Sequence, residues 1–412
     1  LHAALAAAPV TDAGLEEALT QARRALLERG GDAVFAVALA QQCFLNGYAW
    51  WQTDDEGARV ENLRAHVEVG GATDTEVATL ACYAPLHKVR GAEKFTGDVL
   101  AALLRQKRDE PAEENAIAAA LPVLTPIAAT DQGETPWPRW HGHPAMEAPV
   151  TPRAWLENRF PHADLDRVPE KPAMLAAGCG TGQYALHLAR TLVLESVTAI
   201  DLSRASLAYA ARKAADAGMN IRFGQGDILE AAALGRRFGL IECGGVLHQL
   251  ADPFAGWTAL LGLLEPGGLM RVAVHSRVAR ATLTPLQARL AQQGFDESNG
   301  GVRAARHRLM QEDDAVREAP AFFTLEGCRH LLFPGAEHPL ALGDIARFLR
   351  EKDLRLIGLE APQNVRAVFT GAWPARFPRD AAADDLDNWA AFEQENPQTF
   401  AGMIQLWVQR RG

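Results

Sequence analysis

The sequence predicts an α/β protein in which a parallel sheet follows a mainly helical N-terminal region. The first third of the chain has apolar residues at helical spacing and no strand-like alternation before residue 170. After Lys171, short apolar segments alternate with helical patterns, as in βαβ units. A glycine-rich turn, GCGTG, joins the first of these segments to a helical pattern. This order of elements is typical of open α/β sheets that bind a ligand at the carboxyl ends of their strands.

Length, composition and charge limit the classes of protein that this chain can be. Its 412 residues correspond to two or three domains, at roughly 150 residues per domain. Hydrophobic residues make up 48% and charged residues 22%, so we expect a folded globular protein. The net charge of −10 argues against nucleic acid or an anionic membrane as a partner. The longest apolar stretch, residues 256–274, is broken by Glu265 and Pro266, so we expect no membrane span.

Cysteines, histidines and acidic runs add further expectations. The five cysteines include no CxxC pair, which excludes a disulfide framework and predicts a reducing compartment, the cytoplasm. His141 and His143 have no further ligands at useful spacing, so we expect no metal site. We interpret the acidic runs 54–56 and 384–387 as solvated faces. Residues 1–10 lack the basic segment of a signal peptide. The chain begins at Leu1 and not at a methionine, so we expect a piece of a longer protein.

The N-terminal elements are predicted from apolar spacing and from glycine and proline. Helices are expected over residues 14–28, 33–50, 76–86 and 97–107. Prolines then cluster over residues 121–152, which predicts a linker or a partly ordered strap.

The elements after Lys171 alternate. Strands are expected at 173–179, 196–201, 221–227, 238–245 and 269–276. The helices between them are expected at 182–193, 203–218 and 252–264. A late helix and two late strands complete the sheet, at 340–353, 354–360 and 403–409. Two insertions, 277–339 and 361–402, are too long for simple loops, and we expect lids or subdomains there.

Four motifs lie at the expected carboxyl ends of the parallel strands. The glycine turn, Gly178 to Gly182, lets the backbone pass close to a ligand and aims helix N–H groups at it. Its GxGxG spacing differs from the GxGxxG of dinucleotide enzymes. Asp201 ends the second strand, where a carboxylate can accept both hydroxyls of a ribose, and Asp227 ends the third, where an acid can meet an adenine amine. The segment ECGGVLHQL, residues 242–250, follows the fourth strand.

In this order, the motifs LAAGCGTGQ, AIDLS, FGQGDILE, LIECGGVLHQLADP and LEPGGLMRV resemble those of class I S-adenosylmethionine-dependent methyltransferases over residues 173–276. The resemblance implies a Rossmann-like seven-stranded sheet, S-adenosyl-L-methionine as cofactor and methyl transfer as the activity. It implies that Gly178, Gly180 and Gly182 line the methionine moiety and that Asp201 holds the ribose. Asp227 and Ile228 then flank the adenine. The implied cofactor-binding set is Gly178, Cys179, Gly180, Thr181, Gly182, Asp201, Leu202, Gly226, Asp227, Ile228, Glu242, Cys243 and Gly244.

Further segments resemble bacterial methyltransferases whose catalytic part follows tetratricopeptide repeats and, more distantly, rickettsial surface-protein lysine methyltransferases. They include QQCFLNGYAW, EENAIAAALPVLTPI, PWPRW, FFTLEGCRHLLF, HPLALGDIARFL and ENPQTFAGMIQLWVQ. The resemblance implies a protein or peptide side chain, lysine above all, as methyl acceptor. Gly47 stands where the pattern usually has glutamate, so an acidic residue is lost. If that acid handles substrate in the relatives, the substrate of this chain differs from theirs.

Methyl transfer is an in-line displacement that needs the acceptor lone pair near the methyl group and a route for the proton. The candidates for catalysis are Glu242, His248 and His275. Glu242 can instead be a cofactor contact or an anchor for its loop, and His248 can be a structural histidine. The candidates for acceptor binding are Tyr48, Trp137, Arg139 and Trp140, and the alternative for each is packing.

The predicted organisation and its rivals follow from these motifs. We expect a helical N-terminal domain, a strap, a cofactor-binding core, an inserted lid region and a C-terminal completion of the sheet, at 1–135, 136–170, 171–276, 277–339 and 340–412. The rival functions are a small-molecule methyltransferase and a non-catalytic cofactor-binding module. The GxGxG spacing disfavours a nicotinamide dehydrogenase. No Asn/Asp-Pro-Pro-Tyr motif follows the fourth strand, which disfavours nucleic acid as acceptor.

Overall fold

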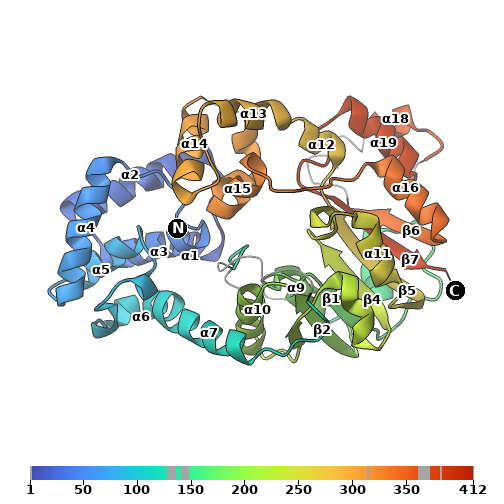
Figure 1. Ribbon diagram of the computed structural model, residues 1–412, viewed down its shortest axis with the longest axis horizontal. Helices are drawn as coiled ribbons and strands as arrows, with labels where there is room; N and C mark the ends of the chain where they lie inside the picture. The colour runs from blue at the N-terminus through green and yellow to red at the C-terminus, as the bar shows by residue number, and fades with distance from the viewer. Residues whose placement is uncertain are drawn as a thin grey trace. The chain divides into compact units, whose positions relative to one another are not determined.

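The computed structural model describes residues 2–127, 136–140, 148–312, 315–360, 372–380 and 383–411. The chain forms two compact units (Figure 1). The helical unit comprises Leu1–Ile117, Trp137–Gly142 and Pro285–Gly335. The sheet unit comprises Ala118–Pro136, His143–Thr284 and Ala336–Gly412. The inserted segment 277–339 is thus shared between the two units, and the lid role expected for it stays a prediction.

The helical unit begins with helices whose first turns are capped by side chains. Its N-terminal helices are α1 (His2–Ala7), α2 (Ala13–Arg29), α3 (Ala33–Leu45), α4 (Asp54–Val69), α5 (Asp74–Ala81) and α6 (Ala101–Leu104). A π-helical turn (Arg105–Asp109) leads into α7 (Glu110–Ala120). Asp12 caps α2 and Thr53 caps α4, each accepting a backbone N–H of the first turn. The helix predicted over 33–50 ends at Leu45, because Gly47 and Tyr48 have positive φ angles.

One sequence interpretation is wrong in this unit. The acidic run 54–56 opens α4, a helix that the sequence analysis missed, and only two of its three carboxylates are exposed. Glu56 is buried: it forms ion pairs with Arg23 (3.3 Å) and Arg24 (2.9 Å) and accepts the Tyr83 hydroxyl (3.0 Å). Those partners come from other elements of the unit, so the local charge pattern did not reveal them.

The inserted helices α13 (Thr284–Gln292), α14 (Asn299–Gln311) and α15 (Leu325–Leu332) complete the helical unit. Arg306 of α14 donates to both carboxylate oxygens of Glu16 on α2, and both side chains are buried. The backbone N–H of Leu325 donates to the carbonyl of Asn46 (2.9 Å). Residues 290 positions apart therefore share one core.

The sheet unit has seven strands in the order β3-β2-β1-β4-β5-β7-β6. The strands are β1 (Ala173–Ala177), β2 (Ser196–Asp201), β3 (Arg222–Gln225), β4 (Phe238–Gly244), β5 (Leu264–Val274), β6 (Leu354–Leu359) and β7 (Ile404–Arg410). The first five are parallel, and β7 is antiparallel to both β5 and β6. This confirms the predicted α/β fold with a seven-stranded Rossmann-like sheet. The antiparallel insertion of β7 between β5 and β6 was not predicted.

Helices cover both faces of the sheet. They are α8 (Pro152–Arg159), α9 (Gln183–Thr191), α10 (Arg204–Asp216), α11 (Pro253–Leu261), α12 (Arg277–Ala281), α16 (Leu342–Glu351), α18 (Ala372–Arg376) and α19 (Leu386–Glu395). Every residue of β1 is buried, because this central strand is covered on both sides. On one face Trp155 of α8 packs against Trp407 of β7, and on the other Trp257 of α11 packs against Phe348 of α16. Helices α16 and α19 pack against each other (Figure 1).

The proline-rich segment begins as an ordered edge of the sheet. Residue 123 forms a parallel bridge with Gln225 of β3, and Leu124 donates its N–H to the Gln225 carbonyl (2.8 Å). Arg204 of α10 holds the same segment by donating to the carbonyl of Leu121 (2.8 Å). Within the part of the chain that the structure describes, no helix is long and apolar enough to cross a membrane.

Candidate functional site

The glycine turn between β1 and α9 is built for close approach of a ligand to the backbone. Gly178, Gly180 and Gly182 have φ angles of 70°, 53° and 76°, a region that favours glycine. A Cβ on Gly178 would lie 2.4 Å from a methyl carbon of Val246, and one on Gly182 would lie 2.7 Å from the Cβ of Ala210. The turn therefore tolerates no side chain at either position.

Asp201 joins the glycine turn to the end of β2. Its Oδ2 accepts the N–H of Gly180 (2.7 Å), and its Oδ1 accepts the N–H of Ser203 (2.8 Å). Ser203 in turn caps α10, as the sequence predicted. The next residue, Leu202, accepts the side-chain amide of Gln225 through its carbonyl (2.8 Å). One carboxylate thus sets the relative position of two βα turns at the carboxyl edge of the sheet.

Asp227 is buried after β3 and is held by a residue that the sequence analysis did not single out. Its N–H donates to the Thr125 hydroxyl (2.7 Å), and that hydroxyl donates to the Asp227 carbonyl (3.1 Å). The Asp227 carboxylate caps the turn Ile228–Leu234 by accepting the Leu229 N–H (2.9 Å). A Cβ on Gly226 would lie 3.0 Å from the Thr125 hydroxyl oxygen. The Thr125 side chain therefore fixes the backbone at Asp227.

Glu242 lies on β4 with its carboxylate engaged within the sheet. It is 3% exposed and forms an ion pair with Arg271 (3.1 Å), its register partner on β5. Burial raises the pKa of Glu242 although the Arg271 guanidinium acts to lower it. Arg271 also lies over the Tyr184 ring, 3.7 Å from its centre. This network favours the structural alternative for Glu242, an anchor of the β4 end, over a direct catalytic role.

The two cysteines of the predicted cofactor set have the properties of unreactive thiols. Burial raises the pKa of Cys179 and of Cys243 well above the ordinary value for cysteine, and Asp201 and Glu242 add to the effect. Thr181 is likewise buried, at 1% exposure. A thiol must lose its proton to act as a nucleophile, so the raised pKa values disfavour a nucleophilic role for Cys179 and Cys243.

His248 and His275 lie together beyond the ends of β4 and β5. His248 belongs to a short turn (Leu247–Gln249), and its ring is 3.9 Å from that of His275, measured between centres. The backbone N–H of His275 donates to Nδ1 of His248 (3.4 Å). Nδ1 of His275 lies 3.3 Å from Oε2 of Glu337, which the sequence analysis did not identify. Arg280 of α12 donates to both oxygens of Glu337, at 2.7 Å to Oε1 and 3.1 Å to Oε2.

The charge state of Glu337 follows from these contacts. Burial alone would raise its pKa, but hydrogen bonds from His275 and Arg280 outweigh burial and hold the pKa at about 2. Glu337 is therefore an anion throughout the neutral range.

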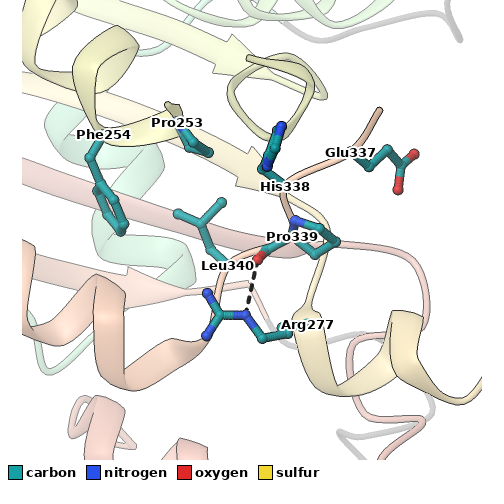
Figure 2. Close-up of a pocket in the computed structure, with 7 residues that line it drawn as sticks. All are labelled: Pro253, Phe254, Arg277, Glu337, His338, Pro339 and Leu340. Atoms are coloured by element: carbon teal, nitrogen blue, oxygen red, sulfur yellow. Dashed lines mark hydrogen bonds between the residues drawn. The ribbon is translucent and has the colours of Figure 1, made fainter. Parts of the chain in front are cut away.

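A cavity of about 390 Å³ lies beside this segment (Figure 2). It is lined by Pro253, Phe254, Arg277, Glu337, His338, Pro339 and Leu340. Arg277 donates to the carbonyl of Pro339 (3.3 Å), and Figure 2 shows the Glu337 carboxylate pointing away from Phe254. Arg277 also pairs with Asp344 (3.0 Å), so its charge is matched within the protein. No sequence motif predicted this cavity.

The four candidate acceptor-binding residues all belong to the helical unit. Arg139 donates to the Phe44 carbonyl (3.2 Å) and lies 4.3 Å from the centre of the Phe44 ring. Trp140 is buried, whereas Trp137 is 37% exposed beside His330. Nε of Arg303 donates a hydrogen bond to the backbone carbonyl of Tyr48 (2.7 Å). Burial raises the pKa of the Tyr48 hydroxyl. Trp137 is the most accessible of the four. His141 and His143 lie outside the described residues.

Comparison with known proteins identifies the domain that carries the glycine turn. Residues 174–268 match the family model described as a methyltransferase domain. With the seven-stranded sheet, this match shows that the chain contains a class I methyltransferase domain, and it confirms the resemblance of the sequence motifs.

Individual relatives match parts of the chain. An uncharacterized protein of Synechococcus sp. is 36% identical over 155 residues, which are 37% of this chain and 34% of that protein. Trans-aconitate 2-methyltransferase of Deinococcus radiodurans is 34% identical over 130 residues, 30% of this chain and 48% of that protein. This chain thus spans between a third and a half of the length of these relatives. The structure of PKMT2 from Rickettsia typhi aligns with a TM-score of 0.46 and 14% identity, covering 64% of this chain and 54% of that chain.

Proposed function

We propose that this protein transfers the methyl group of S-adenosylmethionine to an acceptor. The observation that carries the proposal is the link between Asp201 and the glycine turn, in which one carboxylate at the end of β2 holds the N–H of Gly180. A carboxylate beside a turn of positive-φ glycines suits a ligand with a ribose and an extended charged chain. The match to a methyltransferase domain over residues 174–268 supports the same cofactor.

In this proposal the cofactor lies along the carboxyl edge of the sheet. Gly178, Gly180 and Gly182 line its methionine part, Asp201 takes the ribose hydroxyls, and Asp227 with Ile228 flanks the adenine. Glu242 holds the β4 end, so that the backbone of Cys243 and Gly244 forms the floor near the sulfonium. The methyl donor supplies the electrophilic carbon, and the chain supplies orientation and a path for the acceptor proton.

Calorimetric titration tests the cofactor assignment. Wild type should bind S-adenosylmethionine and its demethylated product but not NAD. Asp201→Asn should weaken binding of both, by about tenfold or more, because an amide cannot accept two ribose hydroxyls and the Gly180 N–H together. Thermal unfolding of the variant checks that the fold is kept. Preferential binding of NAD by wild type would contradict the proposal.

We propose a protein or peptide side chain as acceptor, with lysine favoured. The support is the resemblance to lysine methyltransferases, together with a helical unit that provides surface beyond the cofactor domain. The exposed Trp137, beside His330, supplies a flat apolar contact on that unit. The net charge of −10 supports an acceptor other than nucleic acid, and a sequence whose five cysteines include no CxxC pair supports the cytoplasm as the location.

A small-molecule acceptor is the second candidate. Relatives named trans-aconitate 2-methyltransferase and ubiquinone biosynthesis O-methyltransferase favour it. A lysate of the source cell incubated with the protein and tritiated S-adenosylmethionine separates the two. Tritium that stays in a protein band after treatment with alkali supports lysine as the acceptor. Tritium confined to the small-molecule fraction supports the second candidate. Cofactor binding without label in either fraction would indicate a non-catalytic module.

A further inference from the structure

The His275 imidazole is held between a carboxylate and a second histidine ring. Oε2 of Glu337 lies 3.3 Å from its Nδ1, and the His248 ring lies 3.9 Å from it, measured between centres. The side chain of His275 is 15% exposed, so it is not completely enclosed by the protein. Among the described residues, Nε2 of His275 makes no hydrogen bond.

These contacts select one tautomer. The Glu337 carboxylate can only accept a hydrogen bond, so Nδ1 of His275 carries the proton. The lone pair of the neutral ring is then on Nε2, the nitrogen that makes no hydrogen bond to the described residues. Arg280 binds Glu337 through both carboxylate oxygens and prevents the carboxylate from turning away.

The ring lies one residue beyond β5, on the edge of the sheet that carries the glycine turn. Strands β4 and β5 are paired up to Gly244 and Ala273, and Gly245 donates its N–H to the Ala273 carbonyl (2.8 Å). The carboxyl ends of parallel strands are where such sheets bind their ligands. His275 therefore belongs to the edge at which an acceptor would meet the cofactor.

We propose that His275 removes the proton of the methyl acceptor through Nε2, and that Glu337, clamped by Arg280, is the positioning residue that sets the tautomer. The inference deepens the proposed function and rests on it. As the bond from acceptor to methyl carbon forms, the bond from that carbon to sulfur breaks and its electron pair returns to sulfur. The acceptor proton moves to Nε2 and later leaves to solvent, and the products are the methylated acceptor and S-adenosylhomocysteine.

The arrangement also narrows the acceptor class. An alkyl ammonium or a hydroxyl group carries a proton that must leave, whereas a carboxylate is already deprotonated at neutral pH. A built proton acceptor therefore fits a lysine or hydroxyl acceptor better than a carboxylate acceptor. The acceptor proposed for this chain therefore differs in chemical class from the trans-aconitate in the name of one relative.

The same three side chains also have the ligand types of a metal site, since His248, His275 and Glu337 offer atoms within 4.8 Å of one another. Two features argue for the proton-transfer assignment. The guanidinium of Arg280 already occupies both oxygens of Glu337, and a dication beside it would be repelled. Nδ1 of His248 already accepts the His275 N–H. To bind a metal ion, Glu337 or His248 would have to lose one of these hydrogen bonds.

The direct test determines the tautomer of His275 and needs no methyl acceptor. Histidine-labelled protein is studied by two-dimensional ¹H–¹⁵N spectroscopy of the imidazole rings, and His275→Gln identifies the His275 signals. In wild type we expect the proton on Nδ1. In Glu337→Gln the ring should shift toward the Nε2–H form, because the amide can donate to Nδ1. An Nε2–H tautomer in wild type would overturn the proposal.

The activity test uses methyl transfer to the lysate acceptor across pH 6 to 9. His275→Gln should lower the initial rate by about 10²-fold or more while S-adenosylmethionine binding is unchanged. Glu337→Gln should lower the rate about 10- to 100-fold, because the amide no longer fixes the proton on Nδ1 of His275. Among the described residues, the charged and titratable groups near His275 include His248, Glu337, Arg280 and His338, with Glu393 of α19 bonded to the neighbouring Ser276.

A matched control exists in the helical unit. His66 and Glu76 form an exposed pair with the same 3.3 Å separation between Nδ1 and a carboxylate oxygen. Glu76→Gln should leave both the rate and the pH profile unchanged. A full rate in His275→Gln would contradict the inference and leave the proposed function standing, whereas loss of cofactor binding in wild type would contradict the proposed function itself. Zinc bound at one ion per chain and lost in His275→Gln would overturn the inference in favour of a metal site.

Discussion

At the scale of single residues, the candidate site depends on side chains that limit one another's freedom. Both carboxylate oxygens of Asp201 accept backbone N–H groups. The Thr125 hydroxyl accepts the N–H of Asp227 and donates to the carbonyl of the same residue. Glu337 is restrained by Arg280 on one side and His275 on the other. Restraint of this kind lets a site meet its ligand with little reorganisation.

The first residue-scale prediction concerns steric space in the glycine turn. Gly178→Ala adds a Cβ only 2.4 Å from Val246, in addition to the cost of its positive φ. We expect it to destabilise the fold by about 1–3 kcal/mol more than Gly235→Ala and to weaken cofactor binding. Gly235 is the matched control, because it has a similar φ of 64° and no atom within 4 Å of the position that a Cβ would take. Urea unfolding and calorimetry measure both effects, and equal losses in the two variants would contradict the argument.

The second residue-scale prediction concerns pH. The folded pKa of Glu337 is about 2 against an ordinary 4.5, so its ionised form stabilises the fold fully above about pH 4.5, and that stabilisation is lost as the pH falls toward 2. Glu337→Gln should therefore cost about 1–3 kcal/mol of unfolding free energy at pH 7 and less at pH 4. Urea unfolding at both values checks this. Glu17→Gln, at an exposed position of α2, is the control for the loss of one negative charge. The prediction would be refuted if the stability difference between wild type and Glu337→Gln were as large at pH 4 as at pH 7.

At the scale of elements, the insertion 285–335 is joined to the N-terminal helices by buried polar contacts. Arg306 of α14 binds Glu16 of α2 through two hydrogen bonds and also donates to the Phe322 carbonyl (2.7 Å). The 3₁₀ turns and the short α6 show that the region around 97–107, predicted as one helix, is broken into several pieces. Contacts across the chain, more than helix propensity, hold these elements in place.

The element-scale prediction tests this ion pair. Arg306→Met leaves the Glu16 carboxylate buried without its partner, and we expect a loss of about 3–5 kcal/mol in unfolding free energy, measured by urea unfolding. Adding Glu16→Leu to that variant should recover part of the loss, because the unpaired charge is removed. Arg308→Met is the matched control on the same helix, since Arg308 is exposed and pairs with the neighbouring Glu312. A double variant less stable than Arg306→Met would contradict the argument.

At the scale of the whole molecule, the chain passes repeatedly between its two compact units. The cofactor candidates all belong to the sheet unit, and the acceptor candidates Tyr48, Trp137, Arg139 and Trp140 all belong to the helical unit. The proposed proton acceptor His275 and its positioning residue Glu337 belong to the sheet unit, although 62 positions separate them in sequence. The proposed chemistry thus uses residues from a single unit, and the second unit is proposed to select the acceptor.

The sequence by itself determined the class of fold, the strands and the glycine turn. These depend on short-range patterns: buried strands are continuous apolar runs, helices repeat every three to four residues, and a GxGxG turn needs its glycines within five positions. Asp201 and Asp227 were found for the same reason, because each follows its strand directly.

The tertiary structure alone decided which distant residues meet. The partners Glu337 of His275, Thr125 of Asp227 and Glu16 of Arg306 lie between 62 and 290 positions away in sequence. The insertion of β7 between β5 and β6, antiparallel to both, was likewise decided by the tertiary structure. Such pairings depend on how complete elements pack, and no local spacing of residue types encodes them.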